Sequence, residues 1–268
     1  MKTAVLQLSS QGMSNTKLYN YIRIAHKQGV KLLLLGEYIL NPFFKELEEL
    51  SISMIKEQAE YQTKVLKELS TTYEMTIVVP LVIVKKNKPY KTVAKFAPSS
   101  TSYYYQQLLI NYSHWNEEKY FANEVKELSS PLVFKINSFK FAIITGFEIH
   151  FDEIFAQLKE KNVDCILIPS VSTFGSFKRW ESLAIARAMT NNCYILRANR
   201  IGEYVEQKDE TLWQFYGDSF LISPNGEALE HLGNKEELMI VDMSHSEVIK
   251  ARKFWGFKEM MNKREKLC

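Results

Sequence analysis

The sequence predicts a single-domain α/β fold, and two observations lead to this prediction. Residues 31–37 and 165–170 each contain an almost uninterrupted apolar run, which is typical of strands buried on both faces of a sheet covered by helices. Around these runs, segments with helical character alternate with short segments that read as strands. A chain of 268 residues, 46% of them hydrophobic, can bury one large core, and α/β folds of this size are commonly one domain.

The first part of the chain is expected to contain five strands and three helices. Ser14 or Asn15 can cap a helix with a periodic apolar face, and Gly29 ends that helix. The stretch 42–73 is rich in Glu, Lys and Leu and is expected to form one short and one long helix. The expected strands are residues 2–8, 31–37, 76–84, 90–96 and 103–111.

The second part continues the alternation. Residues 170–179 are expected to form a loop, and the Pro-Asn-Gly sequence from Pro224 predicts a hairpin turn. A charged segment from Ser244 is expected to close the chain as a helix. The remaining expected elements are strands at 131–136, 139–145, 165–170 and 237–243 and helices at 151–161 and 180–191.

Composition narrows the class of protein. The net charge of +3 comes from 34 basic and 31 acidic residues without a long run of like charges, so neither nucleic acid nor a membrane is an expected partner. No apolar stretch approaches the ~20 residues of a membrane span, and no signal-type segment precedes the first strand. Cys165, Cys193 and Cys268 fit reduced thiols. We expect a cytoplasmic protein with no cofactor and no metal site.

Residues 139–153 are the stretch around which the chain is organised. An apolar strand ends at Thr145, Gly146 breaks it, and a helix resumes near Phe151. Open α/β sheets often place a nucleophile at such a turn. The stretch resembles the nucleophile turn of the nitrilase or carbon-nitrogen hydrolase superfamily, in which Cys-Tyr-Asp is followed by Phe-Pro-Glu. In that alignment Gly146 stands at the cysteine position, Phe147 at the aromatic and Glu148 at the acid.

Two further motifs resemble the catalytic motifs of this superfamily. Glu37 follows an apolar strand as the family's glutamate does, although a solvated strand-end carboxylate is the alternative. The family's Tyr-x-Lys corresponds to Tyr104-Tyr105-Gln106, which places Gln106 at the lysine position. Gln107 is the alternative register. Glu117, in a loose match to the Glu-Lys-x-Tyr-Phe sequence of the carbamoyl-amine or β-ureidopropionase-like branch, corresponds to the second glutamate.

Later segments extend the resemblance to about residues 2–255. They are residues 186–194, 198–202, 217–219 and 223–227, which resemble the family's Arg-Ala-x-Glu-Asn helix and following strand, its Asn-Arg-Val-Gly, its Gly-x-Ser strand and its Pro-x-Gly turn. The resemblance implies a four-layer α-β-β-α sandwich made of one carbon-nitrogen hydrolase domain over residues 1–268. It also implies a homodimer or higher homo-oligomer, formed by extension of the sandwich.

The family's chemistry requires a glutamate base, a cysteine nucleophile and a lysine that stabilises the oxyanion with a backbone N–H. Glycine at position 146 has no side chain that attacks, and glutamine at position 106 is a neutral donor in place of a cation. Loss of a nucleophile costs roughly 10⁶ in turnover in a well-studied hydrolase. We therefore expect a family member that has lost the cysteine mechanism and acts as a pseudoenzyme, binding a small amide or amine or regulating a partner.

A few other side chains could replace the missing cysteine or its base. Cys165 and Cys193 lie inside strand-like runs and are expected to be core residues, and strand alternation points Thr145 away from the turn. Glu148 or His150 is a candidate base for a water, although His150 fits a surface position equally well, and His114 is similarly ambiguous. The rival hypothesis is accordingly an active hydrolase of amide or N-carbamoyl C–N bonds that uses water or a non-cysteine nucleophile.

The charge of the pocket follows from the same alignment. Glu37, Glu117 and Glu148 are expected near one pocket with no lysine to offset them. Such a pocket should be net negative or contain a protonated carboxyl group. It would favour amines over carboxylates as ligands.

Overall fold

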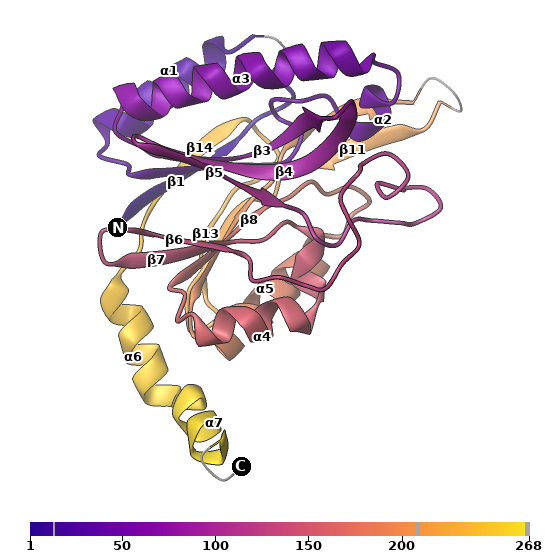
Figure 1. The fold of residues 1–268 in the computed structure, drawn as a ribbon. Coiled ribbons are helices and arrows are strands. Elements are labelled where there is room, and N and C mark those ends of the chain that lie inside the picture. The colour runs from indigo at the N-terminus through magenta and orange to yellow at the C-terminus, as the bar shows by residue number, and fades with distance from the viewer. Residues whose placement is uncertain (13, 207–209, 266–268) are drawn as a thin grey trace.

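The structure is a computed structural model that describes residues 1–12, 14–206 and 210–265. Within these residues two six-stranded sheets pack face to face, and helices cover the outer face of each sheet (Figure 1). The expected α-β-β-α sandwich is therefore confirmed.

The first sheet has the strand order β14-β1-β2-β3-β4-β5. Parallel pairing joins β1 to β2 and β2 to β3, whereas β14, β4 and β5 pair antiparallel with their neighbours. Helices α1 and α3 cover its outer face (Figure 1). The elements are β1 (Lys2–Gln7), α1 (Thr16–Lys27), β2 (Leu32–Leu35), α2 (Phe44–Leu47), α3 (Ile52–Thr72), β3 (Thr76–Lys85), β4 (Lys88–Ala97), β5 (Ser100–Tyr105) and β14 (Glu237–Asp242).

The second sheet has the order β13-β12-β9-β8-β7-β6, with parallel pairs in its centre and antiparallel pairs at its edges. Helices α4 and α5 cover its outer face (Figure 1). The elements are β6 (Leu132–Ile136), β7 (Phe139–Ile143), the 3₁₀ turn η1 (Phe147–His150), α4 (Asp152–Glu160), β8 (Cys165–Pro169), α5 (Phe177–Asn191), β9 (Tyr194–Ala198), β12 (Phe220–Ile222) and β13 (Ala228–His231).

The apolar run in β2 is explained by burial on both faces. Leu33 and Leu35 pack toward α1 and α3, while Leu32 and Leu34 pack against the second sheet. Side chains alternate along a strand, so only a continuous apolar run fills both interfaces. The same argument applies to β8, all of whose residues are buried.

Two further elements lie outside the sandwich. A two-stranded ribbon forms from β10 (Ile201–Val205) and β11 (Leu212–Tyr216). The closing helix is two helices, α6 (His245–Trp255) and α7 (Phe257–Glu265), separated by Gly256 at φ +61°. In Figure 1 these helices extend away from the sheets. No helix among the described residues is long and apolar enough to cross a membrane.

Two expected boundaries are wrong. The strand expected at residues 103–111 ends at Tyr105, because carboxylates take over the backbone donors that follow. Glu148 Oε1 accepts the Gln107 N–H at 2.8 Å, and Glu117 Oε2 accepts the Ile110 N–H at 3.4 Å. The expected 170–179 loop is shorter, since α5 already begins at Phe177.

Candidate functional site

Glu37 lies immediately after β2, where the ends of the two sheets approach each other. Its backbone N–H donates to the Ser170 carbonyl, which follows β8, at 3.0 Å. A Cβ atom at Gly36 would lie 2.7 Å from the Asn199 backbone, so only glycine allows this approach without a shift. Glycine at position 36 thus brings the glutamate up to the second sheet.

A lysine that the sequence analysis did not identify lies beside Glu37. Lys91 of β4 is buried, and its Nζ is 2.6 Å from Glu37 Oε2 and 2.6 Å from Glu117 Oε1. Glu117 is completely buried and also accepts a hydrogen bond from the Tyr38 hydroxyl at 3.0 Å. The expectation of a pocket without a compensating lysine is therefore wrong.

Burial and the neighbouring charges shift the pKa values of Glu37 and Lys91. Desolvation raises the pKa of Glu37 to about 7, with Lys91 opposing the rise and Glu117 adding to it. Desolvation by itself would lower the pKa of Lys91, but the two carboxylates together raise it. Lys91 is consequently a fixed cation, and Glu37 exchanges its proton near neutral pH.

Gly146 begins the turn after β7 and carries no reactive group. Its backbone is helical, with φ −51° and ψ −50°, and its N–H donates to the Pro169 carbonyl at 2.9 Å. A Cβ atom built there would lie 2.7 Å from Ser170 Cβ and 3.5 Å from Glu37 Oε1. The position is therefore next to the glutamate, as the resemblance implied, but Ser170 leaves no room for a side chain without movement.

A cavity of about 340 Å³ opens beside this cluster. Glu37 and Lys91 contribute to its lining, and aromatic side chains form much of the wall: Tyr112, Trp115, Phe147, Phe174 and Trp180. Three residues of this lining have a buried polar atom without a hydrogen-bond partner among the described residues: Glu37 Oε2, Trp115 Nε1 and Thr173 Oγ1. Of these, Glu37 Oε2 is in an ion pair with Lys91.

Both histidines proposed as pocket residues line this cavity. His114 is exposed and stacks on Tyr112, with ring centroids 5.8 Å apart. His150 Nδ1 lies 2.8 Å from the Phe147 carbonyl, and its Nε2 lies 3.4 Å from Arg179 Nε. Burial lowers the pKa of His150, so its imidazole is neutral at pH 7. Arg179 adds a cation to the lining of the cavity.

Glu148, the third proposed pocket residue, does not line this cavity. Both of its carboxylate oxygens are occupied by neighbouring donors, at distances of 2.8–2.9 Å: the Tyr104 hydroxyl and the backbone N–H groups of Gln107 and Thr145. The carboxylate is completely buried and joins the end of β5 to the turn after β7. Its role as a candidate base for a water is therefore contradicted.

The two glutamines of the uncertain register also face elsewhere. Gln106 is buried and donates from Nε2 to the Leu108 carbonyl at 2.7 Å, and it is not part of the cavity lining. The Gln107 side chain bonds the Tyr104 hydroxyl and the Ser129 backbone. Neither contributes a donor to the cavity.

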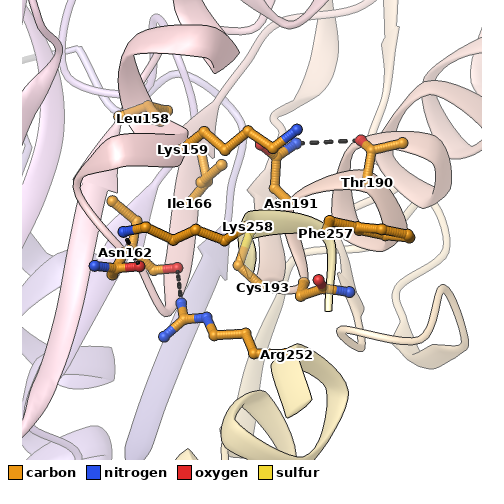
Figure 2. Close-up of a pocket in the computed structure, with 12 residues that line it drawn as sticks. Leu158, Lys159, Asn162, Ile166, Thr190, Asn191, Cys193, Arg252, Phe257 and Lys258 are labelled. Atoms are coloured by element: carbon orange, nitrogen blue, oxygen red, sulfur yellow. Dashed lines mark hydrogen bonds between the residues drawn. The ribbon is translucent and has the colours of Figure 1, made fainter. Parts of the chain in front are cut away.

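The cysteines among the described residues are core residues. Cys165 is completely buried between the sheets, and burial raises the pKa of its thiol. Cys193 borders a separate cavity of about 120 Å³ between α4, α5 and the closing helices, near Arg252 and Phe257 (Figure 2). Burial raises the pKa of Cys193 to about 12, so it is not a thiolate at neutral pH. Cys268 lies outside the described residues.

A metal site finds no support in the part of the chain that the structure describes. No three His, Cys, Asp or Glu side chains there are grouped so that they could hold a metal ion. Glu37, Lys91 and the neutral His150 are among the groups on the cavity lining that are suited to hydrogen bonding or proton transfer.

Comparison with known families decides the ancestry. The model of the carbon-nitrogen hydrolase family matches residues 2–253. This chain belongs to the carbon-nitrogen hydrolase family. Among curated relatives, N-carbamoylputrescine amidase of Oryza sativa subsp. japonica is 23% identical, over 88% of this chain and 82% of that protein. Deaminated glutathione amidase of Synechocystis is 24% identical, over 90% of each chain.

Solved structures show the same fold. A carbon-nitrogen hydrolase from Helicobacter pylori superposes with a TM-score of 0.83 at 17% identity, covering 97% of this chain and 94% of that one. An amidase from Nesterenkonia sp. superposes with a TM-score of 0.77 at 18% identity, covering 95% and 96%. These likenesses establish the architecture that brings positions 37, 91 and 146 together.

The residue that sequence reasoning missed is Lys91. The available signal was a lysine inside the strand predicted at residues 90–96, followed by Thr-Val-Ala. A buried lysine is rare unless it is paired, so a lysine among apolar strand residues is a reason to look for a carboxylate partner.

Proposed function

We propose that this member of the carbon-nitrogen hydrolase family binds a small neutral amide or N-carbamoyl compound at the Glu37 cavity without the cysteine mechanism. The observation that supports this most is Gly146, which lies against Ser170 at the position that the resemblance assigns to the family's nucleophile. The amide-recognising environment remains, in the form of a glutamate, a lysine and a second glutamate. The chain thus keeps polarity suited to an amide but lacks the group that would attack it.

The proposed ligand class is narrower than the small amide or amine expected from the sequence. Lys91 offsets one of the two carboxylates, and the raised pKa of Glu37 removes part of the remaining charge near neutral pH. Arg179 adds positive charge at the cavity lining. With these positive charges, a neutral carbonyl compound suits this cluster better than the ammonium group of an amine.

The test is a thermal-shift and calorimetric titration of the full chain with short primary amides, N-carbamoyl amines, and matched amines and carboxylates. We expect the neutral amides to raise the melting temperature, Glu37→Gln to change their affinity, and no ammonia release above buffer. If no amide or carbamoyl compound shifts the melting temperature at millimolar concentration, the binding proposal is wrong.

A second candidate, hydrolysis by water, is favoured by one specific observation. Glu37 Oε1 faces the space where a side chain at 146 would begin, and a pKa of about 7 suits a general base near neutral pH. Ammonia release that Glu37→Gln abolishes, with one ¹⁸O from labelled water in the product acid, would replace the binding proposal with this one. The expected dimer and cytoplasmic location stay predictions.

A further inference from the structure

We infer that Lys91 has taken over, from the adjacent strand, the place of the lysine that the family carries at position 106, and that its ammonium group donates to the carbonyl oxygen of the ligand. The inference rests on the proposed function, because it concerns the same cavity. It assigns a ligand-contacting role to a residue outside the family's motifs.

The register of the first sheet makes this exchange geometrically simple. Thr92 pairs with Tyr105, and the next backbone bond runs from the Gln106 N–H to the Lys91 carbonyl at 3.2 Å. Positions 91 and 106 are therefore cross-strand neighbours, about 5 Å apart as adjacent strands are. A lysine has a long flexible stem, so moving it across one strand spacing leaves its ammonium able to reach the same carboxylates.

The hydrogen-bonding capacity of Lys91 leaves one donor over. An ammonium group has three N–H donors. One N–H donates to Glu117 Oε1 at 2.6 Å, and Nζ forms an ion pair with Glu37 Oε2 at 2.6 Å. Within the described residues no other acceptor is bonded to Nζ. The residue itself lines the cavity, so the remaining N–H is available to a ligand there. The Tyr38 ring, 5.2 Å from Nζ, further stabilises the charge.

Position 106, in contrast, no longer serves the cavity. Gln106 is neutral, its Nε2 is committed to the Leu108 carbonyl, and its buried Oε1 has no partner among the described residues. An orphaned buried oxygen is a sign that the local environment was not built around this side chain. Position 91 therefore supplies a cation to the cluster, and position 106 does not.

The experiment exchanges the two side chains. Amide affinity is measured by calorimetry for the wild type, for Lys91→Gln with Glu117→Gln, and for the exchange variant Lys91→Gln with Gln106→Lys. Removing Glu117 together with Lys91 takes away one charge of each sign, which protects folding. Lys88→Gln is the matched control, because Lys88 is an exposed lysine on the same strand.

We expect the Lys91→Gln/Glu117→Gln variant to lose ten-fold or more in amide affinity, the exchange variant to recover to within about three-fold of wild type, and the control to be unchanged. Equal affinity with and without the lysine at 91 overturns the inference. So does a folded exchange variant that binds as weakly as the double glutamine variant.

A second readout does not need the natural ligand and separates this inference from the proposed function. Gly146→Cys is combined with Ser170→Gly to make room, and the pKa of the introduced thiol is read from the pH dependence of its alkylation. Because Glu37 lies between the thiol position and Lys91, the lysine charge should hold that pKa down.

Adding Lys91→Gln/Glu117→Gln or the exchange pair to this thiol variant gives the comparison. We expect the thiol pKa to rise when position 91 loses its charge and to return when position 106 gains it. A thiol pKa that does not respond to either change refutes the role of Lys91. No amide binding by wild type together with the expected thiol response would refute the proposed function alone.

Discussion

Glu37 and Glu148 are both completely buried, yet their surroundings are opposite. Glu148 accepts three hydrogen bonds from one hydroxyl and two backbone amides, and it does not line the Glu37 cavity. Glu37 has a single strong partner, Lys91, which it shares with another carboxylate, and one of its oxygens faces the empty side-chain space of Gly146. A fully coordinated carboxylate holds segments together, whereas a sparsely coordinated one beside a cavity remains available for a proton or a ligand.

Lys91→Met should produce the largest effect, because it leaves two buried carboxylates without their cation. We expect the free energy of unfolding to fall by about 3–5 kcal/mol, measured by urea denaturation at pH 7. Lys88→Met on the same strand is exposed and should stay within about 0.5 kcal/mol of wild type. A loss below about 1 kcal/mol in Lys91→Met would show that Glu37 and Glu117 do not depend on this cation for their stability in the folded chain.

Glu148→Ala should be the next most damaging change. It leaves a buried hydroxyl and two buried amide donors without an acceptor, so we expect a loss of roughly 3 kcal/mol in the free energy of unfolding. Glu57→Ala on the exposed face of α3 is the matched control. If Glu148→Ala were as mild as this control, the contrast between the two buried glutamates would not hold.

Glu37→Gln tests the sparsely coordinated carboxylate through the pH dependence of stability. The pKa of Glu37 is about 7 in the folded chain and 4.5 as its reference, so the folded state binds a proton more tightly than the unfolded state. Its contribution to stability is therefore present below pH 4.5 and is lost as pH rises through 7, by up to about 3 kcal/mol.

Urea denaturation at pH 5 and pH 8 measures this contribution. The wild type should be favoured over Glu37→Gln at pH 5 by more than it is at pH 8, because only the wild type carries the titrating group. A stability difference that is the same at both pH values would place the pKa of Glu37 near its ordinary value.

Gly146→Ala should have the smallest of these effects. The added Cβ lies 2.7 Å from Ser170 Cβ, and overpacking of this kind costs about 1–3 kcal/mol. Adding Ser170→Gly removes the contact, so the double variant should be more stable than the sum of the single effects predicts. Additive effects in thermal denaturation would show that the chain relaxes at this turn without involving Ser170.

The fold was predictable because its signals are local. The run in β2 and the strand, turn and helix around Gly146 are each readable within a few residues, and the family motifs placed Glu37 correctly beside that turn. The site was less predictable, because its partners come from distant segments. Lys91 of β4 meets Glu37, which follows β2, because β3 pairs with both of these strands. Strand alternation alone does not say which partner a buried lysine finds.

Glu148 shows a different limit. Its alignment with the acid of the family turn suggested a pocket residue, but the donors that saturate it come from β5 and from the segment after it. The position of Glu148 in the sequence predicts that it lies near Gly146. It does not predict the direction in which its side chain points. The number of hydrogen-bond donors around a carboxylate decides whether it holds segments together or is free to react. That number depends on three-dimensional contacts and cannot be read from the sequence.

The pairing of the first strand with the last sets the order in which this molecule can fold. Lys2 of β1 lies opposite Asp242 of β14, and the Ser219 N–H reaches back to Gln7 Oε1. Contacts so distant in sequence carry a large loop-closure entropy and form late. A chain emerging from the ribosome must therefore hold β1 without its partner until β14 has been made. Substitutions that weaken only the pairing of β1 with β14 should accordingly speed unfolding much more than they slow folding.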